Sequence, residues 1–217
     1  MMTRPKEIRV LLADDHVMVR EGLTQLLREH PSIEVAGQAG SGEEVLAQAE
    51  TAKPDVVVLD YSMPKGDAPT VIGQLRKRFP RVRILVLTVH ENIHYAVNVL
   101  EAGAQGYIIK SSAVQELVDA IRAVHGGEIF ISAKLSQSVL KHLLTPKKER
   151  AGLEALSQRE FDMLRVLGAG MSLTASAEYL DISPSAASTY RARLMEKLRL
   201  DSTAAIIRFA LENGIVG

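Results

Sequence analysis

The alternation of apolar and polar segments along this chain predicts a sheet flanked by helices. Short apolar runs predict five β-strands, at residues 8–13, 33–39, 55–59, 83–87 and 106–109. Between these runs the apolar residues recur at helical spacing, as in Leu117, Ile121 and Val124. Because strand and helix alternate five times, we expect an α/β fold with a doubly wound, five-stranded parallel sheet.

The pattern changes after residue 127. Residues 133–144 have helical apolar spacing, and residues 145–152 are mostly polar. From Ser157 onward the spacing is helical throughout. Ser157 and Glu160 have the spacing of a capping box, and Ser183 directly before a proline is typical of a helix start. We therefore predict three parts: an α/β domain at 1–130, a linker at 131–155 and a small all-α domain at 156–217.

The composition excludes several classes of protein and site. Hydrophobic residues make up 47% of the chain and charged residues 24%, which is ordinary for a globular protein with a buried core. The chain has no cysteine, which excludes a disulfide framework, a thiolate metal site and a cysteine nucleophile. No window approaches the roughly 20 apolar residues that cross a bilayer. The short apolar run after the charged start does not suit a signal peptide, so we expect a cytoplasmic protein without a membrane partner.

Charge is balanced over the whole chain but differs between its parts. Residues 1–130 contain 14 basic and 17 acidic side chains, whereas residues 131–217 contain 12 and nine. A more basic C-terminal part is a hint of a nucleic-acid partner. Much of this excess comes from residues 131–150, so charge that faces DNA must come from local placement in the helical domain.

Residue types that carry chemistry follow four of the predicted strands. Asp14 and Asp15 come after the first strand, and Asp60, Thr88 and Lys110 end the third, fourth and fifth. In an open α/β sheet, ligand-binding groups gather at the carboxyl ends of the strands. An aspartate after a strand is often only a cap or turn residue, and a lone threonine or lysine there means little. The joint placement of all five is much harder to explain in that way.

Three carboxylates at one edge predict a cation site. Their mutual repulsion raises their pKa values unless a cation is present, and Mg²⁺ prefers a few carboxylates together with water and phosphate oxygens. A phosphoryl group that arrives there would be neutralised by Mg²⁺ on one side and by Lys110 on the other. One of the aspartates could then act as the nucleophile.

Four motifs resemble those of a response-regulator receiver domain: L-L-A-D-D-H at 11–16, V-V-V-L-D-Y-S-M-P at 56–64, L-T at 87–88 and G-Y-I-I-K at 106–110. The resemblance covers about residues 6–127 and implies a flavodoxin-like fold with Asp60 as the phosphoacceptor. It implies Mg²⁺ coordination by Asp15, Asp60 and the Ser62 carbonyl, with Asp14 acting mainly through water. It also implies that Thr88 swings toward the phosphoryl group, Tyr107 turns inward behind it, and Lys110 binds a phosphoryl oxygen. The chain departs from the family at Ser111, where a proline usually follows the lysine.

The C-terminal part resembles the NarL/FixJ-type (LuxR-type) helix-turn-helix domain. The matching segments are L-S-Q-R-E at 156–160, Gly170, L-D-I-S at 180–183, R-L-M-E-K-L at 193–198 and E-N-G-I at 212–215. By this resemblance, residues 184–199 form the recognition helix that lies in the major groove of DNA.

The start of this helix departs from the family. Ala186 and Ala187 stand where a Thr-Val pair is usual, and Ser188 stands where a lysine is frequent. Few long side chains therefore remain to contact bases. The expected DNA contacts are Ser185, Ser188, Thr189, Tyr190, Arg191, Arg193 and Lys197. Packing in the small core explains Tyr190 equally well, because an amphipathic tyrosine can do both.

These features favour a phosphorylation-controlled transcription regulator of a two-component system. A sensor histidine kinase, or a small acyl phosphate in its place, would phosphorylate Asp60. The phosphorylated protein would form a homodimer and bind double-stranded DNA. Its only reactions would be phosphoryl transfer to Asp60 and the loss of that group, so it would not be an enzyme for an outside substrate. Two alternatives stay open: an enzyme that works through an aspartyl phosphate, and a response regulator whose divergent helix-turn-helix binds proteins instead of DNA.

Overall fold

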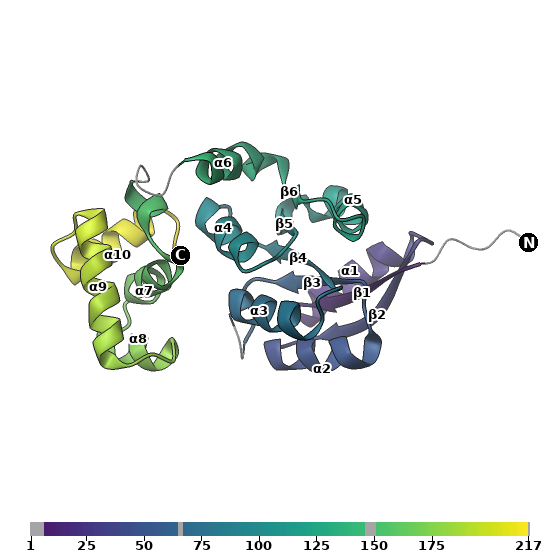
Figure 1. The fold of residues 1–217 in the computed structure, drawn as a ribbon, viewed down its shortest axis with the longest axis horizontal. Helices are drawn as coiled ribbons and strands as arrows, with labels where there is room; N and C mark the ends of the chain where they lie inside the picture. Colours follow the sequence, from purple (N-terminus) through teal and green to yellow (C-terminus); the bar gives the residue numbers. More distant parts are fainter. Residues whose placement is uncertain (1–6, 65–66, 146–150, 217) are drawn as a thin grey trace, which may run out of the picture. The chain divides into compact units, whose positions relative to one another are not determined.

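The computed structural model describes residues 7–64, 67–145 and 151–216. The chain forms two compact units, Met1–Gln137 and Ser138–Gly217, and its elements are labelled in Figure 1. The predicted linker at 131–155 includes residues 146–150, which lie outside the described residues. The boundaries of the three predicted parts therefore stay a prediction.

A parallel sheet is the centre of the first unit. Its strands lie in the order β2-β1-β3-β4-β5-β6, with β1 at Ile8–Ala13, β2 at Ile33–Ala39, β3 at Val56–Asp60, β4 at Arg83–Thr88, β5 at Gly106–Ile109 and β6 at Phe130–Ile131. The parallel α/β fold and the five predicted strands are confirmed, although β3 and β4 end one residue later than expected. The predicted number of five strands was wrong. The sixth strand has two residues, which pair with Gly106 and Tyr107, and two residues are too few to give a period in the sequence.

Helices cover both faces of this sheet. They are α1 at Val17–Arg28, α2 at Gly42–Ala52, α3 at Ala68–Arg78, α4 at Ile93–Glu101 and α5 at Ala113–His125. Leu27 of α1 and Ile121 of α5 join Val10 and Leu12 of β1 in one buried cluster, so α1 and α5 share a face. Helices α2, α3 and α4 lie on the other face, where α3 contacts both α2 and α4.

Burial on both faces explains the continuous apolar run of β3. Residues Val56 to Leu59 are each at most 1% exposed, and full burial of such a side chain contributes about 1.5–3 kcal/mol. From β1 the chain builds outward to β2 on one side and to β3 and beyond on the other. The carboxyl ends of β1 and β3 therefore form a topological switch point, which is where open α/β sheets bind ligands.

Among the residues that the structure describes in the second unit there are helices joined by turns and loops, and no strand. Its elements are the 3₁₀ turn η3 at Gly152–Ala155 and the helices α7 at Gln158–Gly168, α8 at Leu173–Tyr179, α9 at Pro184–Leu198 and α10 at Thr203–Glu212. The helix expected at residues 133–144 is α6 (Ala133–Leu144), which runs across the boundary between the units. The helix expected at 184–199 ends one residue early, because Arg199 has a left-handed φ of 54°.

Helix α7 is the centre of this helical unit and packs against α9 and α10. Its Phe161 and Leu164 are buried together with Leu194 of α9 and Ile206 of α10. Gly168 allows the close approach of α10, because a Cβ atom there would lie 2.4 Å from the Cβ of Ala210. None of the helices in the described ranges is long and apolar enough to span a membrane.

Candidate functional site

The structure brings four of the predicted residues together at the carboxyl ends of the strands. Asp14 directly follows β1, Asp60 ends β3, Thr88 ends β4 and Lys110 directly follows β5. Asp14, Asp60 and Thr88 are buried, whereas Lys110 is partly exposed. The sheet therefore fixes the relative positions of these groups, as the sequence predicted.

The ammonium group of Lys110 lies between the two buried carboxylates. Its Nζ is 2.6 Å from Oδ2 of Asp14 and 3.0 Å from Oδ2 of Asp60. One positive charge is shared by two negative ones, so the cluster keeps an excess of negative charge. Such a cluster favours a further cation.

Burial and neighbouring charges have opposing effects on the pKa values of Asp60 and Lys110. Burial raises the pKa of Asp60, the negative charge of Asp14 adds to the rise, and hydrogen bonding to Lys110 opposes it. Burial alone would lower the pKa of Lys110, but its hydrogen bonds to Asp14 and Asp60 outweigh this and raise it. Lys110 therefore stays protonated, and its charge helps to keep Asp60 ionised.

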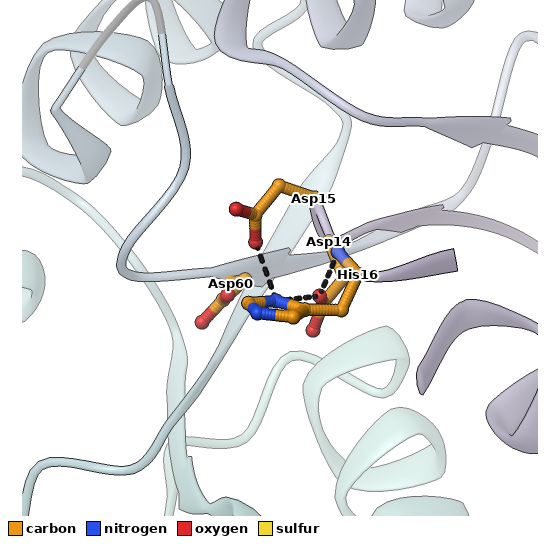
Figure 2. Close-up of side chains that lie close together, drawn as sticks. All are labelled: Asp14, Asp15, His16 and Asp60. Carbon is orange, nitrogen blue, oxygen red and sulfur yellow. Dashed lines mark hydrogen bonds and ion pairs between the residues drawn. The ribbon is translucent and has the colours of Figure 1, made fainter. Parts of the chain in front are cut away.

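Asp14, Asp15, His16 and Asp60 form a group with the spacing of metal ligands. One potential ligand atom from each lies within 4.8 Å of all the others, and Figure 2 shows the three carboxylates around the His16 ring. Nδ1 of His16 is 2.7 Å from Oδ1 of Asp15 and 3.3 Å from Oδ1 of Asp14. Three carboxylates suit a hard cation such as Mg²⁺. His16 was not among the predicted ligands, although it directly follows the aspartate pair.

Ser62 lies directly after Tyr61 in the loop that begins at the end of β3. A backbone hydrogen bond from Ser62 lowers the pKa of Asp60. Its hydroxyl Oγ is 3.3 Å from Nε2 of His90. Coordination of a metal by the Ser62 carbonyl stays a prediction.

Thr88 and Tyr107 are linked through the backbone of His90. The His90 amide donates to Oγ1 of Thr88 at 3.1 Å, and the Tyr107 hydroxyl donates to the His90 carbonyl oxygen at 2.8 Å. Tyr107 is fully buried, and this burial raises its pKa. The Tyr107 side chain therefore lies inside the receiver, and its movement on phosphorylation stays a prediction.

An aromatic cluster holds His90 in place, and sequence analysis did not find it. The His90 ring stacks on Tyr95 with ring centroids 4.0 Å apart, and Tyr61 meets both rings edge-on. These residues belong to the end of β3, the loop after β4 and helix α4. No local sequence pattern indicates that they meet.

Ser111, which departs from the proline usual in the family, follows Lys110 through a trans peptide bond. The described residues contain no cis peptide bond, and Lys110, Ser111 and Ser112 form the short 3₁₀ turn η1. This turn leads directly into α5 and leaves the Lys110 ammonium beside Asp14 and Asp60.

Helix α9 carries the residues that were expected to contact DNA. Ser185, Ser188, Thr189 and Arg193 are exposed, and Tyr190 and Arg191 are partly buried. The hydroxyls of Ser188 and Thr189 donate to backbone carbonyls one turn earlier in α9, each at 3.0 Å. The Arg191 guanidinium is 3.3 Å from Oγ1 of Thr203 at the start of α10. Arg193 is the long cationic side chain of this set that makes neither a hydrogen bond nor an ion pair with the residues that the structure describes.

Lys197 has partners within its own unit. Its Nζ donates to a carboxylate oxygen of Glu160 at 2.7 Å and to the Ala155 carbonyl at 3.0 Å. The same Glu160 carboxylate forms the predicted capping box with Ser157. Burial would raise the pKa of Glu160, but hydrogen bonds from Lys197 and from the Ser157 amide lower it. Lys197 therefore ties α9 to the start of α7, a role that the sequence analysis did not predict.

Comparison with known proteins agrees with both units. Family models match for the response regulator receiver domain over residues 10–122 and for bacterial regulatory proteins of the luxR family over residues 154–210. Response regulator GacA of Pseudomonas viridiflava is 34% identical over 96% of this chain and 98% of its own length. Response regulator UvrY of Escherichia coli (strain K12) is 32% identical over 96% of this chain and 95% of its own.

A solved structure is similar over nearly the whole chain. RcsB from Salmonella enterica serovar Typhimurium, bound to the promoter rprA in the presence of the phosphomimetic BeF₃⁻, is 25% identical. The match has a TM-score of 0.75 and covers 94% of this chain and 98% of that one. Both resemblances inferred from the sequence motifs are thereby confirmed. This chain belongs to the response regulators of two-component systems, with a receiver domain followed by a luxR-type regulatory domain.

Proposed function

We propose that a sensor histidine kinase phosphorylates this regulator on Asp60, and that phosphorylation controls DNA binding by α9. The observation that carries the proposal is the placement of a buried Asp60 carboxylate beside Asp14 and Lys110 at the switch point of the sheet. Asp60 has the nucleophilic oxygen, and Lys110 has the charge that a phosphoryl group requires. Both phosphorylation by the kinase and binding to DNA would take place in the cytoplasm.

The transfer itself needs little from the protein beyond position and charge. An oxygen of the Asp60 carboxylate attacks the phosphorus of the donor's phosphohistidine. A P–O bond forms, the P–N bond breaks, and the electron pair leaves with the imidazole, which takes a proton. Hydrolysis of the acyl phosphate by water later releases inorganic phosphate and restores Asp60. The protein would thus accept and lose a phosphoryl group on its own Asp60 and would turn over no other substrate.

A cation would complete the charge balance of this site. Mg²⁺ held by Asp14, Asp15, Asp60 and the Ser62 carbonyl would offset the repulsion between the carboxylates and the incoming phosphoryl group. Lys110 bonds to Asp14 and Asp60 before the reaction. After transfer we expect it to bind a phosphoryl oxygen, because its pKa is raised and it stays charged.

The response would pass through Thr88, His90 and Tyr107. Thr88 accepts a hydrogen bond from the His90 amide, so a turn of the Thr88 hydroxyl toward a phosphoryl group would remove that bond. The His90 carbonyl holds the Tyr107 hydroxyl, so both residues would respond together. Such a switch shifts an existing equilibrium, and we propose that it favours a homodimer.

DNA binding would rest on the cationic side of α9. Arg191, Arg193, Lys197 and Arg199 outnumber the acidic Glu196 in the second half of the helix and its cap. Phosphate contacts of this kind position a protein on the duplex. RcsB, whose structure matches 94% of this chain, was solved on promoter DNA. With short side chains at Ser185, Ser188 and Thr189, specificity would depend on two half-sites and on DNA shape.

A second candidate function has a specific observation in its favour. The hydroxyls of Ser188 and Thr189 bond to their own helix, and Lys197 bonds to Glu160. The two hydroxyls would have to leave these carbonyls to donate a hydrogen bond to DNA, and much of the Lys197 charge is already offset by Glu160. If they do not, α9 would act through protein partners while control through Asp60 stays the same.

Labelling with a small acyl phosphate tests the phosphoacceptor. The protein is incubated with acetyl phosphate and Mg²⁺, and the adduct is mapped by mass spectrometry. We expect one acid-stable, base-labile phosphoryl group on Asp60 and none in excess chelator. Asp67→Ala is the matched control, because Asp67 is exposed and caps α3. Labelling of an Asp60→Ala variant to the same extent, or labelling in chelator, would disprove the assignment.

A further inference from the structure

A cavity lies at the end of the sheet opposite to Asp60. It opens between the C-terminal end of α2 and the turn that joins α3 to β4. Helices α2 and α3 contact each other and lie side by side in Figure 1. Its volume is about 390 Å³, within the range of small-molecule sites. It belongs wholly to the receiver unit and contains none of the residues of the acidic site.

The interior of this cavity is apolar. Ala49, Pro54 and Val82 are buried parts of the wall, and Phe79 adds an aromatic ring. The guanidinium of Arg78 lies over this ring, 5.3 Å from its centroid, and also bonds to Glu50 at 3.1 Å. Arg78 therefore contacts both the ring and the acidic side chain at the cavity. A ligand that enters would meet mainly carbon atoms.

The mouth of the cavity is positively charged. Lys53 and Arg81 line it and are exposed, and neither side chain makes a hydrogen bond or ion pair with any residue that the structure describes. The acidic Glu50 is already paired with Arg78. Lys53 and Arg81 are therefore both available to bind an anion at the entrance of the apolar cavity.

Lys53 also has an unusual backbone. Its φ is 44°, in the left-handed region that glycine or asparagine adopts most easily. A side chain with a Cβ atom is strained there. A long cation is nevertheless present at this helix end, at the mouth of the cavity.

We infer that this cavity binds a small amphipathic carboxylate. Its apolar body would occupy the space between Ala49, Pro54, Phe79 and Val82, and its carboxylate would lie between Lys53 and Arg81. Such a site combines an apolar interior with a few polar groups that fix orientation. It is separate from phosphorylation, because β3 runs from this end of the sheet to Asp60 at the other.

Titration of the full-length, ¹⁵N-labelled protein with decanoate tests the inference. We expect saturable shifts of amide signals within residues 49–54 and 79–82, with a dissociation constant on the order of a millimolar. Decylamine has a similar chain with the opposite charge, so it should bind at least several-fold more weakly. Equal binding of decylamine, or shifts centred elsewhere, would overturn the inference.

Two charge variants sharpen this test. Lys53→Asn removes the cation and keeps a residue that tolerates the left-handed backbone, and Arg81→Gln removes the other. Each should weaken decanoate about two- to fivefold, as expected for one exposed charge pair. Lys77→Gln, an exposed lysine of α3 outside the cavity, should bind as the parent does. Unchanged binding in the double variant would overturn the inference.

A last arm separates a free carboxylate from a membrane lipid. Sedimentation with phosphatidylglycerol vesicles should leave the protein in solution. Association with vesicles that Lys53→Asn abolishes, without shifts from decanoate, would overturn the assignment to a free ligand. The charge variants should still be labelled at Asp60 by acetyl phosphate, which separates this proposal from the proposed function.

Discussion

The Glu160–Lys197 pair should stabilise the helical unit by a measurable amount. Glu160 is 3% exposed and Lys197 36% exposed, with 2.7 Å between Nζ and the carboxylate oxygen. A hydrogen bond to a charged group contributes about 1.5–3 kcal/mol, and solvent screening at the more exposed lysine reduces this. We therefore expect Lys197→Met, which keeps most of the aliphatic stem, to lower the free energy of unfolding by about 1–2 kcal/mol.

The same pair should make stability depend on pH in acid. The pKa of Glu160 is lowered from its ordinary value of 4.5, so the folded unit binds this proton less readily than the unfolded chain. The stabilisation is complete above pH 4.5 and is lost as the pH falls through the lowered folded value. In Lys197→Met this loss between neutral and acid pH should be smaller.

Amide hydrogen exchange in the full-length protein measures both effects, because it reports α7 and α9 separately from the receiver. Arg193→Met is the matched control: Arg193 is an exposed cation of the same helix, and its removal should change stability by less than about 0.5 kcal/mol. Equal protection in Lys197→Met and Arg193→Met would refute the reasoning. So would an acid-dependent loss of protection that is the same in Lys197→Met as in the parent.

Three further predictions concern DNA, packing and assembly. Arg193→Ala should weaken binding to all duplexes and flatten the log–log salt dependence by about one unit, measured by fluorescence anisotropy, whereas Thr189→Ala should change which sequences are selected from a random pool. An unchanged salt slope would count against a phosphate contact. Gly168→Ala should destabilise the helical unit by about 1–3 kcal/mol, since the new Cβ would lie 2.4 Å from that of Ala210. Thermal denaturation gives this value, and Gly73→Ala, where nothing lies within 4 Å, should cause no loss. Beryllofluoride should double the mass seen by light scattering for the parent but not for Asp60→Ala, and the same mass for both would contradict a phosphorylation-dependent dimer.

The meeting of the acidic residues was predictable because it depends only on strand direction. Once the strands are parallel, residues at their carboxyl ends must lie at one edge, and Asp14, Asp60, Thr88 and Lys110 are all at such ends. Strand β6 was not predictable. It consists of Phe130 and Ile131, both half-buried, and it exists because β5 offers a free edge.

Contacts between side chains from distant segments of the chain also could not be predicted from the sequence. The stacking of His90 on Tyr95 depends on how α4 returns to the sheet, which no apolar period encodes. Glu160 was predicted as a capping residue from its spacing to Ser157. Its second role, as the acceptor for Lys197, joins residues 37 positions apart and depends on the packing of α7 against α9.

The central claim is that phosphorylation of Asp60 controls DNA binding. Duplexes selected from a random pool are titrated with full-length protein at low salt, with and without acetyl phosphate and Mg²⁺, and binding is followed by fluorescence anisotropy. We predict tighter binding by the phosphorylated parent, and no response to acetyl phosphate in Asp60→Ala. An equal response in Asp60→Ala would contradict control through this residue. Absence of duplex binding by the phosphorylated parent, where phosphate contacts are strongest, would contradict the DNA-binding function and favour a protein partner.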